Sequence, residues 1–383
     1  MTKFILVIIL LVFTFPYSVQ AIYEPLSVPN NKYGIHIIDE NDLESAAHLV
    51  NSSGGDWGYV TMVITGQDKK FEKWADIFEN LAKFHLIPIV RIATAANEDH
   101  WLAPEIDEIN NWVDFLDKLP WPVKNRYITV YNEPNHAKEW GGKINPAGYA
   151  KILSVYSDKL KAKSADFFIL PAGLDSSAPD SPGTMDQVRF IKEMLKAENG
   201  IFDKIDGWTS HSYPNPNFTG RVTDRGRGTI ANFVWEINLL KNLGISKTLP
   251  VFITETGWLH NGNNLDSNLL SPDSVAENIL MADELIWQKY DIVALSPFLL
   301  NYQSQPFSGF SWQKLNSGKF YPQYDAYRSI LKINGKPVIN KIEPSQTPNF
   351  KNQNIQGASV SNSNYSQTDI LYAIWTLIRR IIG

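Results

Sequence analysis

The chain has 383 residues, of which 44% are hydrophobic and 20% charged, which are ordinary values for a globular protein. The length allows one large domain with short appendages, because a single core stops growing at roughly 250–300 residues. A formal net charge of −5 gives no polycationic field and argues against a nucleic acid partner, while the absence of cysteine excludes disulfides, thiolate nucleophiles and cysteine-ligated metals.

The first residues have the layout of a secretion signal. Residues 1–21 contain one lysine, an apolar stretch from Phe4 to Phe15, and small residues at Val19 and Ala21. This pattern predicts a signal peptide that is cleaved after Ala21, and hence a secreted or cell-surface protein. An uncleaved membrane anchor is the alternative, but the apolar stretch is shorter than the roughly 20 residues of a membrane span.

From Lys32 onward, short apolar runs rich in β-branched residues alternate with amphipathic stretches. The runs predict strands within residues 33–39, 58–65, 87–93, 127–134, 167–175, 206–214, 249–258 and 292–301. In the stretches that follow, apolar residues recur every three or four positions, which predicts helices. These helices are expected over residues 41–52, 68–85, 105–119, 146–163, 186–198, 229–244, 274–290 and 321–332.

Alternation of strands and helices predicts an α/β protein with a parallel sheet, and eight such units predict a (β/α)8 TIM barrel. An open doubly wound sheet would need a glycine-rich phosphate turn after its first strand, and residues 37–45 contain no glycine. The barrel domain is expected over residues 22–336.

The composition changes after Lys336. Residues 337–366 are rich in Asn, Ser and Gln without a period, which predicts a flexible polar linker. Residues 367–383 form a short apolar segment with two arginines, too short for an ordinary membrane span. Three interpretations fit this segment: an interfacial helix that attaches weakly to a membrane or cell surface, a remnant of an anchor, or a helix that docks on the barrel.

Polar residues at the carboxyl ends of the predicted strands mark the expected site, because this end of a barrel carries the active site. Glu133, preceded by Asn132, ends the fourth predicted strand, and Glu255 ends the seventh. A single glutamate there is equally well explained by a salt bridge, but two in equivalent places form a constellation. Paired carboxylates suit cleavage of a glycosidic bond, in which one protonates the leaving oxygen and the other attacks or stabilises the anomeric carbon.

Further polar side chains end the neighbouring strands. Arg91, His211 and Tyr213 are candidate donors around a nucleophilic carboxylate, and His36 ends the first predicted strand. Structural roles are the alternatives, with Arg91 in an ion pair with a loop acid and His211 as the cap of a strand end.

Aromatic rings in the loops after the strands are candidate platforms for sugars, whose apolar C–H faces stack on aromatic rings. A structural plug is the alternative for each ring. The candidates are Trp57, Trp101, Trp140, Trp258, Phe310 and Trp312. Together with the long loops they predict a carbohydrate partner in a pocket or a bounded cleft.

Three motifs carry a family resemblance: NEP at 132–134, HSY at 211–213 and ETGW at 255–258. In these positions they resemble the clan A (4/7) group of retaining glycoside hydrolases with (β/α)8 barrels, over roughly residues 32–335. The resemblance implies that Glu133 is the general acid/base and Glu255 the nucleophile. It also implies that Asn132 holds the sugar 2-hydroxyl, that Tyr213 and His211 bond around the nucleophile and acid, and that no metal or organic cofactor takes part.

The chain departs from this group in two places. Many members carry a tryptophan at the end of the eighth strand, where this chain has Phe298 and Asn301, and the arginine that supports the nucleophile often lies on an earlier strand than Arg91. ETGW resembles the β-1,3-glucanase-like branches and NEPN the xylosidase-like ones, so no single family is selected.

The leading hypothesis from the sequence is a secreted retaining glycosidase that cleaves β-linked oligo- or polysaccharides by double displacement. A transglycosylase on the same site and a non-catalytic carbohydrate-binding surface protein are the alternatives. The presence of both glutamates argues against the non-catalytic protein.

Overall fold

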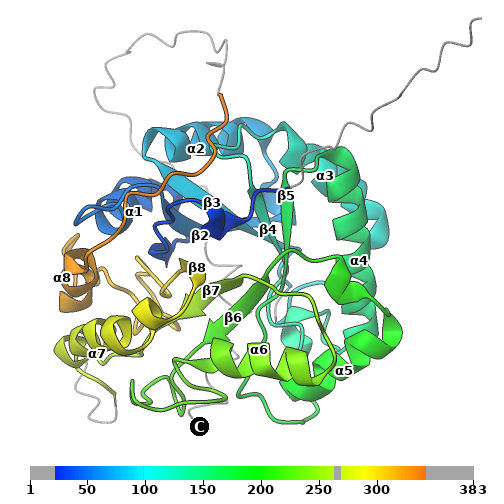
Figure 1. Ribbon diagram of the computed structural model, residues 1–383. Helices are drawn as coiled ribbons and strands as arrows, with labels where there is room; N and C mark the ends of the chain where they lie inside the picture. Colours follow the sequence, from blue (N-terminus) through cyan, green and yellow to red (C-terminus); the bar gives the residue numbers. More distant parts are fainter. Residues whose placement is uncertain (1–21, 98, 263–268, 342–383) are drawn as a thin grey trace, which may run out of the picture.

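The computed structural model describes residues 22–97, 99–262 and 269–341 (Figure 1). The predicted signal peptide (1–21), residues 342–366 of the predicted linker and the C-terminal segment (367–383) lie outside these residues, so those three stay predictions. Within the described residues, no helix is long and apolar enough to cross a bilayer.

The described part of the chain forms a ring of parallel strands surrounded by helices, which confirms the predicted (β/α)8 barrel (Figure 1). Strands β1 to β5 pair in sequence order, and so do β6 to β8. Leu295 N donates to Lys32 O (2.8 Å) between β8 and β1, and Asp206 N donates to Ile169 O (2.8 Å) between β6 and β5. The strands are β1 Gly34–His36, β2 Gly58–Thr65, β3 Leu86–Ala93, β4 Arg126–Val130, β5 Phe167–Pro171, β6 Trp208–Ser212, β7 Val251–Thr256 and β8 Ile292–Leu295.

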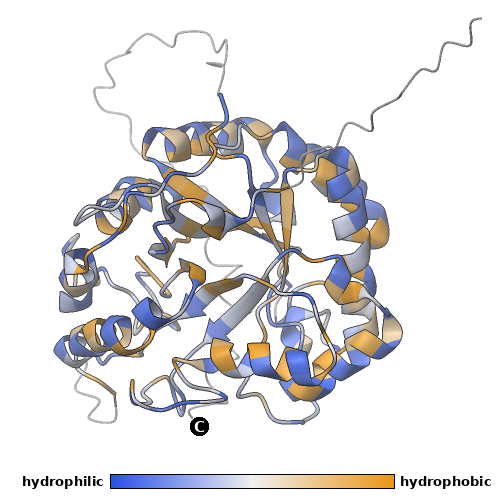
Figure 2. Cartoon of the chain, viewed as in Figure 1, coloured by the Kyte–Doolittle hydropathy of each residue, from blue (hydrophilic) through white to orange (hydrophobic). Residues whose placement is uncertain are grey.

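A helix follows each strand and carries both hydrophobic and hydrophilic residues (Figure 2). All but α7 lie within their predicted ranges, and α7 begins two residues earlier because Ser271 Oγ caps it by accepting from Ser274 N (3.0 Å). The helices are α1 Leu43–Val50, α2 Phe71–Lys83, α3 Ile109–Lys118, α4 Pro146–Lys163, α5 Gln187–Ala197, α6 Asn232–Asn242, α7 Pro272–Leu285 and α8 Pro322–Ser329.

The alternation of side chains along the strands divides the core into two parts. Outward residues such as Ile128 and Val130 pack in a large cluster with the helices. Inward residues fill the barrel near the amino ends of the strands, where the rings of Tyr127, Phe168 and Phe252 lie 5.0–5.5 Å apart between centroids. This aromatic plug closes the interior, so only the carboxyl ends of the strands can form an open site.

Two chain segments cover the amino end of the barrel. Residues 23–30 lie across it, and residues 331–341 run from α8 past α1 (orange in Figure 1). Asn340 Nδ2 donates to the carbonyl oxygens of Trp121 (3.0 Å) and Val123 (2.9 Å). These bonds extend the barrel domain beyond its predicted end at Lys336, and the linker begins later than expected.

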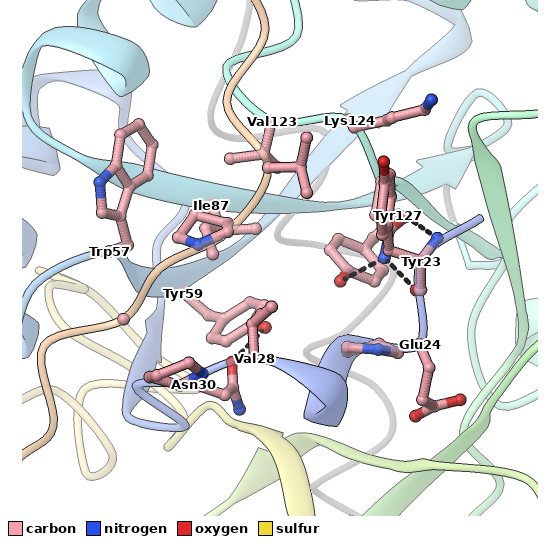
Figure 3. A pocket seen from close by; sticks show the side chains of 16 residues that line it. Tyr23, Glu24, Val28, Asn30, Trp57, Tyr59, Ile87, Val123, Lys124 and Tyr127 are labelled. Atoms are coloured by element: carbon pink, nitrogen blue, oxygen red, sulfur yellow. Dashed lines mark hydrogen bonds between the residues drawn. The ribbon is translucent and has the colours of Figure 1, made fainter. Parts of the chain in front are cut away.

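A small pocket of about 30 Å³ lies beneath these segments, between Tyr23, Trp57, Tyr59 and Tyr127 (Figure 3). Its volume allows for little more than a water molecule.

Candidate active site

A bulge in β7 determines where Glu255 points. Ser210 pairs with Ile253 but His211 pairs with Glu255, so Thr254 is an extra residue in β7. Phe252 faces the barrel interior, and strict alternation would therefore turn Glu255 outward. The extra residue reverses the alternation and directs the Glu255 side chain into the barrel mouth.

The end of β4 is turned by unusual backbone angles. Tyr131 has φ 67° and Glu133 has φ 28°, values that are strained for residues with a side chain. The Tyr131 ring packs outward between Trp140 and Tyr156, and Glu133 N donates to Gly173 O (3.0 Å). These contacts hold the turn that brings the Glu133 side chain to the same cavity as Glu255.

The two glutamates face a cavity of about 260 Å³ at the carboxyl ends of the strands. It brings together most of the predicted polar residues and two of the predicted aromatic residues. Those that line it are Arg91, Asn132, Glu133, His211, Tyr213, Glu255, Trp101 and Phe310.

A connected set of bonds joins the two carboxylates. His211 Nδ1 lies 2.7 Å from Glu133 Oε1 and 3.7 Å from Glu255 Oε2. Tyr213 Oη donates to Glu255 Oε2 (3.0 Å), and Arg91 Nη1 donates to Glu255 Oε1 (3.5 Å). One oxygen of each glutamate and one nitrogen of His211 lie within 4.8 Å of one another. The glutamates therefore share one small site.

The surroundings lower the pKa of Glu255 and raise the pKa of His211. Burial alone would raise the pKa of Glu255, but the positive charges of His211 and Arg91 and the Tyr213 hydroxyl lower it. Burial alone would lower the pKa of His211, but the charge of Glu255 and the bond with Glu133 raise it to about 9. At neutral pH the site thus holds an ionised Glu255 beside a protonated His211.

These charge states bear on whether the site holds a metal. Glu133, His211 and Glu255 are close enough together to ligate a cation. A histidine with a pKa of about 9 carries protons on both nitrogens at neutral pH, and a metal needs an unprotonated nitrogen. The three groups therefore suit proton transfer better than metal binding.

His36 lies next to Glu255 and does not line the cavity, contrary to its prediction as a substrate-binding residue. It is 1% exposed, and its Nε2 lies 4.0 Å from Glu255 Oε1. Burial, the largest cause, lowers the pKa of His36 to about 3, so the ring is neutral. The ring also contacts Phe298 edge to face (5.2 Å between centroids), which places His36 behind the cavity wall as a support for Glu255.

The structure corrects the prediction for Trp140, Trp258 and Trp312, which lie in the core and not on the cavity wall. Trp140 packs against Tyr131, and Trp312 packs against Tyr327. Trp258 Nε1 donates to Gly220 O (2.8 Å). In each case the loop folds over the rim and buries the ring, which removes a large apolar surface from water. Trp57 lies at the opposite end of the barrel, stacked on His85.

The prediction missed several residues of the cavity. Among them His136 and Glu139 follow the NEP motif on a loop and a 3-10 turn, η5 (Ala137–Glu139), which folds back towards the barrel axis. His136 Nε2 lies 2.9 Å from Oδ2 of Asp175, which follows β5. Asp175 was expected among the polar residues at the strand ends, and for His136 and Glu139 the available signal was their position just after the NEP motif. The opposite side of the cavity is apolar and carries Phe218, Phe298 and Phe307.

Fold and site together describe a (β/α)8 barrel with paired carboxylates after β4 and in β7. No protein-family model matches the chain, and no curated protein matches its sequence. Among solved structures, the chain is similar to a monomeric beta-xylosidase from Caulobacter crescentus CB15, with 14% identity and a TM-score of 0.50 over 79% of this chain and 68% of that one. It is also similar to a glucosidase from Croceicoccus marinus, with 8% identity and a TM-score of 0.56 over 79% and 68% of the two chains. At these identities the similarity shows the barrel fold.

Proposed function

We propose that the protein is a retaining glycoside hydrolase that acts on β-linked carbohydrates. The observation that carries the proposal is the placement of Glu133 and Glu255, which have oxygens within 4.8 Å of each other in different surroundings. Retaining glycosidases hold their carboxyl groups about 5–5.5 Å apart, whereas inverting ones need roughly 6.5–9.5 Å to admit a water. Two similar structures, a xylosidase and a glucosidase, support the same class of activity.

In the proposed mechanism Glu255 is the nucleophile. Arg91, His211 and Tyr213 keep its carboxylate ionised, and Tyr213 and Arg91 orient one oxygen each. A free oxygen lone pair attacks the anomeric carbon while the glycosidic oxygen departs, which gives a covalent glycosyl-enzyme.

Glu133 is the proposed acid/base. The protonated His211 holds its Nδ1–H against Glu133 Oε1 (2.7 Å) and is the source of the proton. Glu133 takes this proton and passes it to the departing oxygen, and in the second step it takes a proton from the water that attacks the glycosyl-enzyme and returns it to His211. The site ends in its starting protonation state, and the product keeps its anomeric configuration.

The test is a screen of aryl glycosides and polysaccharides against residues 22–383, with anomeric products followed by NMR. We expect Glu255→Ala to lower kcat by at least about 10³-fold and Glu133→Ala by roughly 10²–10⁴-fold. Glu193→Gln, an exposed glutamate on α5, is the matched control and should retain full activity. Full activity of Glu255→Ala, or an inverted first product, would contradict the proposal. Product analysis with excess sugar acceptor separates hydrolysis from transglycosylation.

Secretion and surface attachment belong to the same proposal. They depend on the signal-like residues 1–21 and on the apolar segment 367–383. Expression of the full chain, with detection of the mature N-terminus and of protein bound to the cell surface, tests both. A mature protein that begins at Met1 would contradict secretion by cleavage.

A further inference from the structure

The cavity contains a third glutamate, Glu139, that the proposed mechanism does not use. It ends η5, and its backbone is well fixed: Glu139 N donates to His136 O (3.0 Å), and the flanking Lys138 O accepts from Trp101 N (2.7 Å). Ala137 N donates to Gly183 O (2.9 Å) in the loop after β5. The chain therefore holds the Glu139 side chain on the cavity wall by bonds from both sides.

Glu139 differs from the other acidic residues of the cavity in its bonding. Within the described residues its carboxylate makes no hydrogen bond and no ion pair shorter than 4.0 Å, although Arg91 lies close enough to influence its charge. The other carboxylates each have a basic partner: His211 for Glu133, Arg91 for Glu255 and His136 for Asp175. The oxygens of Glu139 are thus acceptors that the protein itself leaves unused.

The Glu139 side chain is partly buried and faces the cavity. Burial, followed by the negative charges of Glu133 and Glu255, raises the pKa of Glu139 to about 7. A bound ligand would displace the water around this carboxyl group, so its own hydrogen-bond donors have to replace those of the water. Two adjacent hydroxyls of a sugar ring provide donors at the spacing of the two carboxylate oxygens.

The charges in the cavity are arranged in pairs. Arg91 lies beside Glu255, His211 beside Glu133 and His136 beside Asp175. With a pKa of about 7, the carboxyl group of Glu139 carries only part of a negative charge at neutral pH and attracts a cation less than an ionised carboxylate does. Neutral hydroxyls bond to either form of the carboxyl group, so a diol suits it better than an ammonium group.

We propose that Glu139 is a specificity-determining residue whose carboxylate binds a pair of adjacent hydroxyls of the substrate. The proposal rests on the proposed glycosidase function, because it gives the carbohydrate a second anchor beside the Glu133–Glu255 pair. Substrates that lack one of these hydroxyls should be poor ones, since they leave the carboxylate without a donor.

The experiment compares the wild-type protein with Glu139→Gln on the best aryl glycoside of the screen and on its monodeoxy analogues. We expect Glu139→Gln to lower kcat/KM roughly 10–100-fold on the parent sugar, mostly through KM. On the analogue that lacks a hydroxyl bound by Glu139, wild type and variant should differ by less than about threefold, because both have lost the same interaction. Glu193→Gln is again the control.

A purely structural role would give a different pattern. Because the Glu139 side chain makes no hydrogen bond or ion pair within the described residues, Glu139→Gln should not lower the Tm. Unchanged kcat/KM in Glu139→Gln, or equal additional losses on every deoxy analogue, would overturn the proposal. A wild-type preference for an amino sugar that disappears in the variant would overturn the choice of hydroxyls.

Failure of the proposed function would look different from failure of this inference. In that case wild type and Glu255→Ala would be indistinguishable on every glycoside. Calorimetry with the matching methyl glycosides then tests Glu139 by binding alone. A Kd at least tenfold higher in Glu139→Gln than in the wild type supports its role. Equal Kd values, or no binding to either protein, overturn it.

Discussion

The two ends of the barrel differ in how their polar side chains are bonded. At the amino end, Tyr59 Oη donates to Asn30 Oδ1 (2.8 Å; both residues are labelled in Figure 3). Asn125 Nδ2 donates to Tyr127 Oη and to Tyr23 O, and Asn125 Oδ1 accepts from Tyr23 N. At the carboxyl end, Asn132 Oδ1 and Arg91 Nε line the cavity and are buried without a hydrogen-bond partner in the described residues. Arg126 Nε, at the start of β4, is also buried without a partner there but does not line the pocket at the amino end. Buried polar groups are normally bonded, so the unpaired ones indicate where a ligand is expected.

The cavities at the two ends differ in the same sense. The volume is about 260 Å³ beside the glutamates and about 30 Å³ beneath the terminal segments. Only the larger one can take a sugar ring. Bonding and volume together identify the carboxyl end as the working end and the amino end as a structural closure. Substitutions at the two ends should therefore affect different properties of the protein.

Apart from the two glutamates themselves, the largest effect is expected from Gly173→Ala. A methyl group at Gly173 would overlap Cδ2 and Nε2 of His211, so the imidazole would have to shift from its position against Glu133. We expect kcat/KM to fall about 100-fold or more, because displacement by about 1 Å can cost that much. The free energy of unfolding should fall by about 1–3 kcal/mol.

The matched control is Gly183→Ala, since a methyl group there meets no atom within 4 Å. Kinetics on the best glycoside and chemical denaturation of both variants measure the difference. If Gly173→Ala kept wild-type activity, the position of His211 would not matter for the reaction. The role given to His211 beside Glu133 would then be wrong.

Not all of this site could be predicted from the sequence. The eight apolar runs that alternate with amphipathic stretches were enough to predict the barrel, and the NEP and ETGW motifs were enough to place Glu133 and Glu255 at its mouth. The bulge at Thr254 leaves no mark in the sequence, although without it Glu255 would point outward. The prediction of sugar platforms was wrong for Trp140 because position in a loop does not tell which way a ring turns. Glu139 was missed because the η5 fold-back depends on tertiary contacts.

A moderate effect is expected on the pH dependence of activity. The pKa of His211 is about 9, above its ordinary value of 6.5, so kcat/KM should fall as the pH rises through about 9 and the proton is lost. The same proton stabilises the fold fully below pH 6.5, and this contribution disappears as the pH rises through 9. A pH profile of kcat/KM, with thermal unfolding at each pH, measures both.

Tyr213→Phe sharpens this prediction. It removes the donor to Glu255 Oε2, so the pKa of Glu255 should rise and the acidic limb should move to higher pH while the alkaline limb stays near 9. The maximum of kcat/KM should fall roughly 10–100-fold, as expected for a lost bond to a charged group. An acidic limb that does not move would show that Glu255 does not control it.

The smallest effect is expected from Tyr59→Phe at the amino end. The substitution removes the hydroxyl that donates to Asn30 and leaves the ring in the aromatic plug. The free energy of unfolding should fall by about 1 kcal/mol, the usual net value of one hydrogen bond, and kcat/KM should not change. Tyr290→Phe, on a half-exposed ring whose hydroxyl has no bonding partner in the described residues, is the control and should leave both unchanged. A change of kcat/KM in Tyr59→Phe would mean that the plug transmits strain to the glutamates, and the two ends could then no longer be treated as independent.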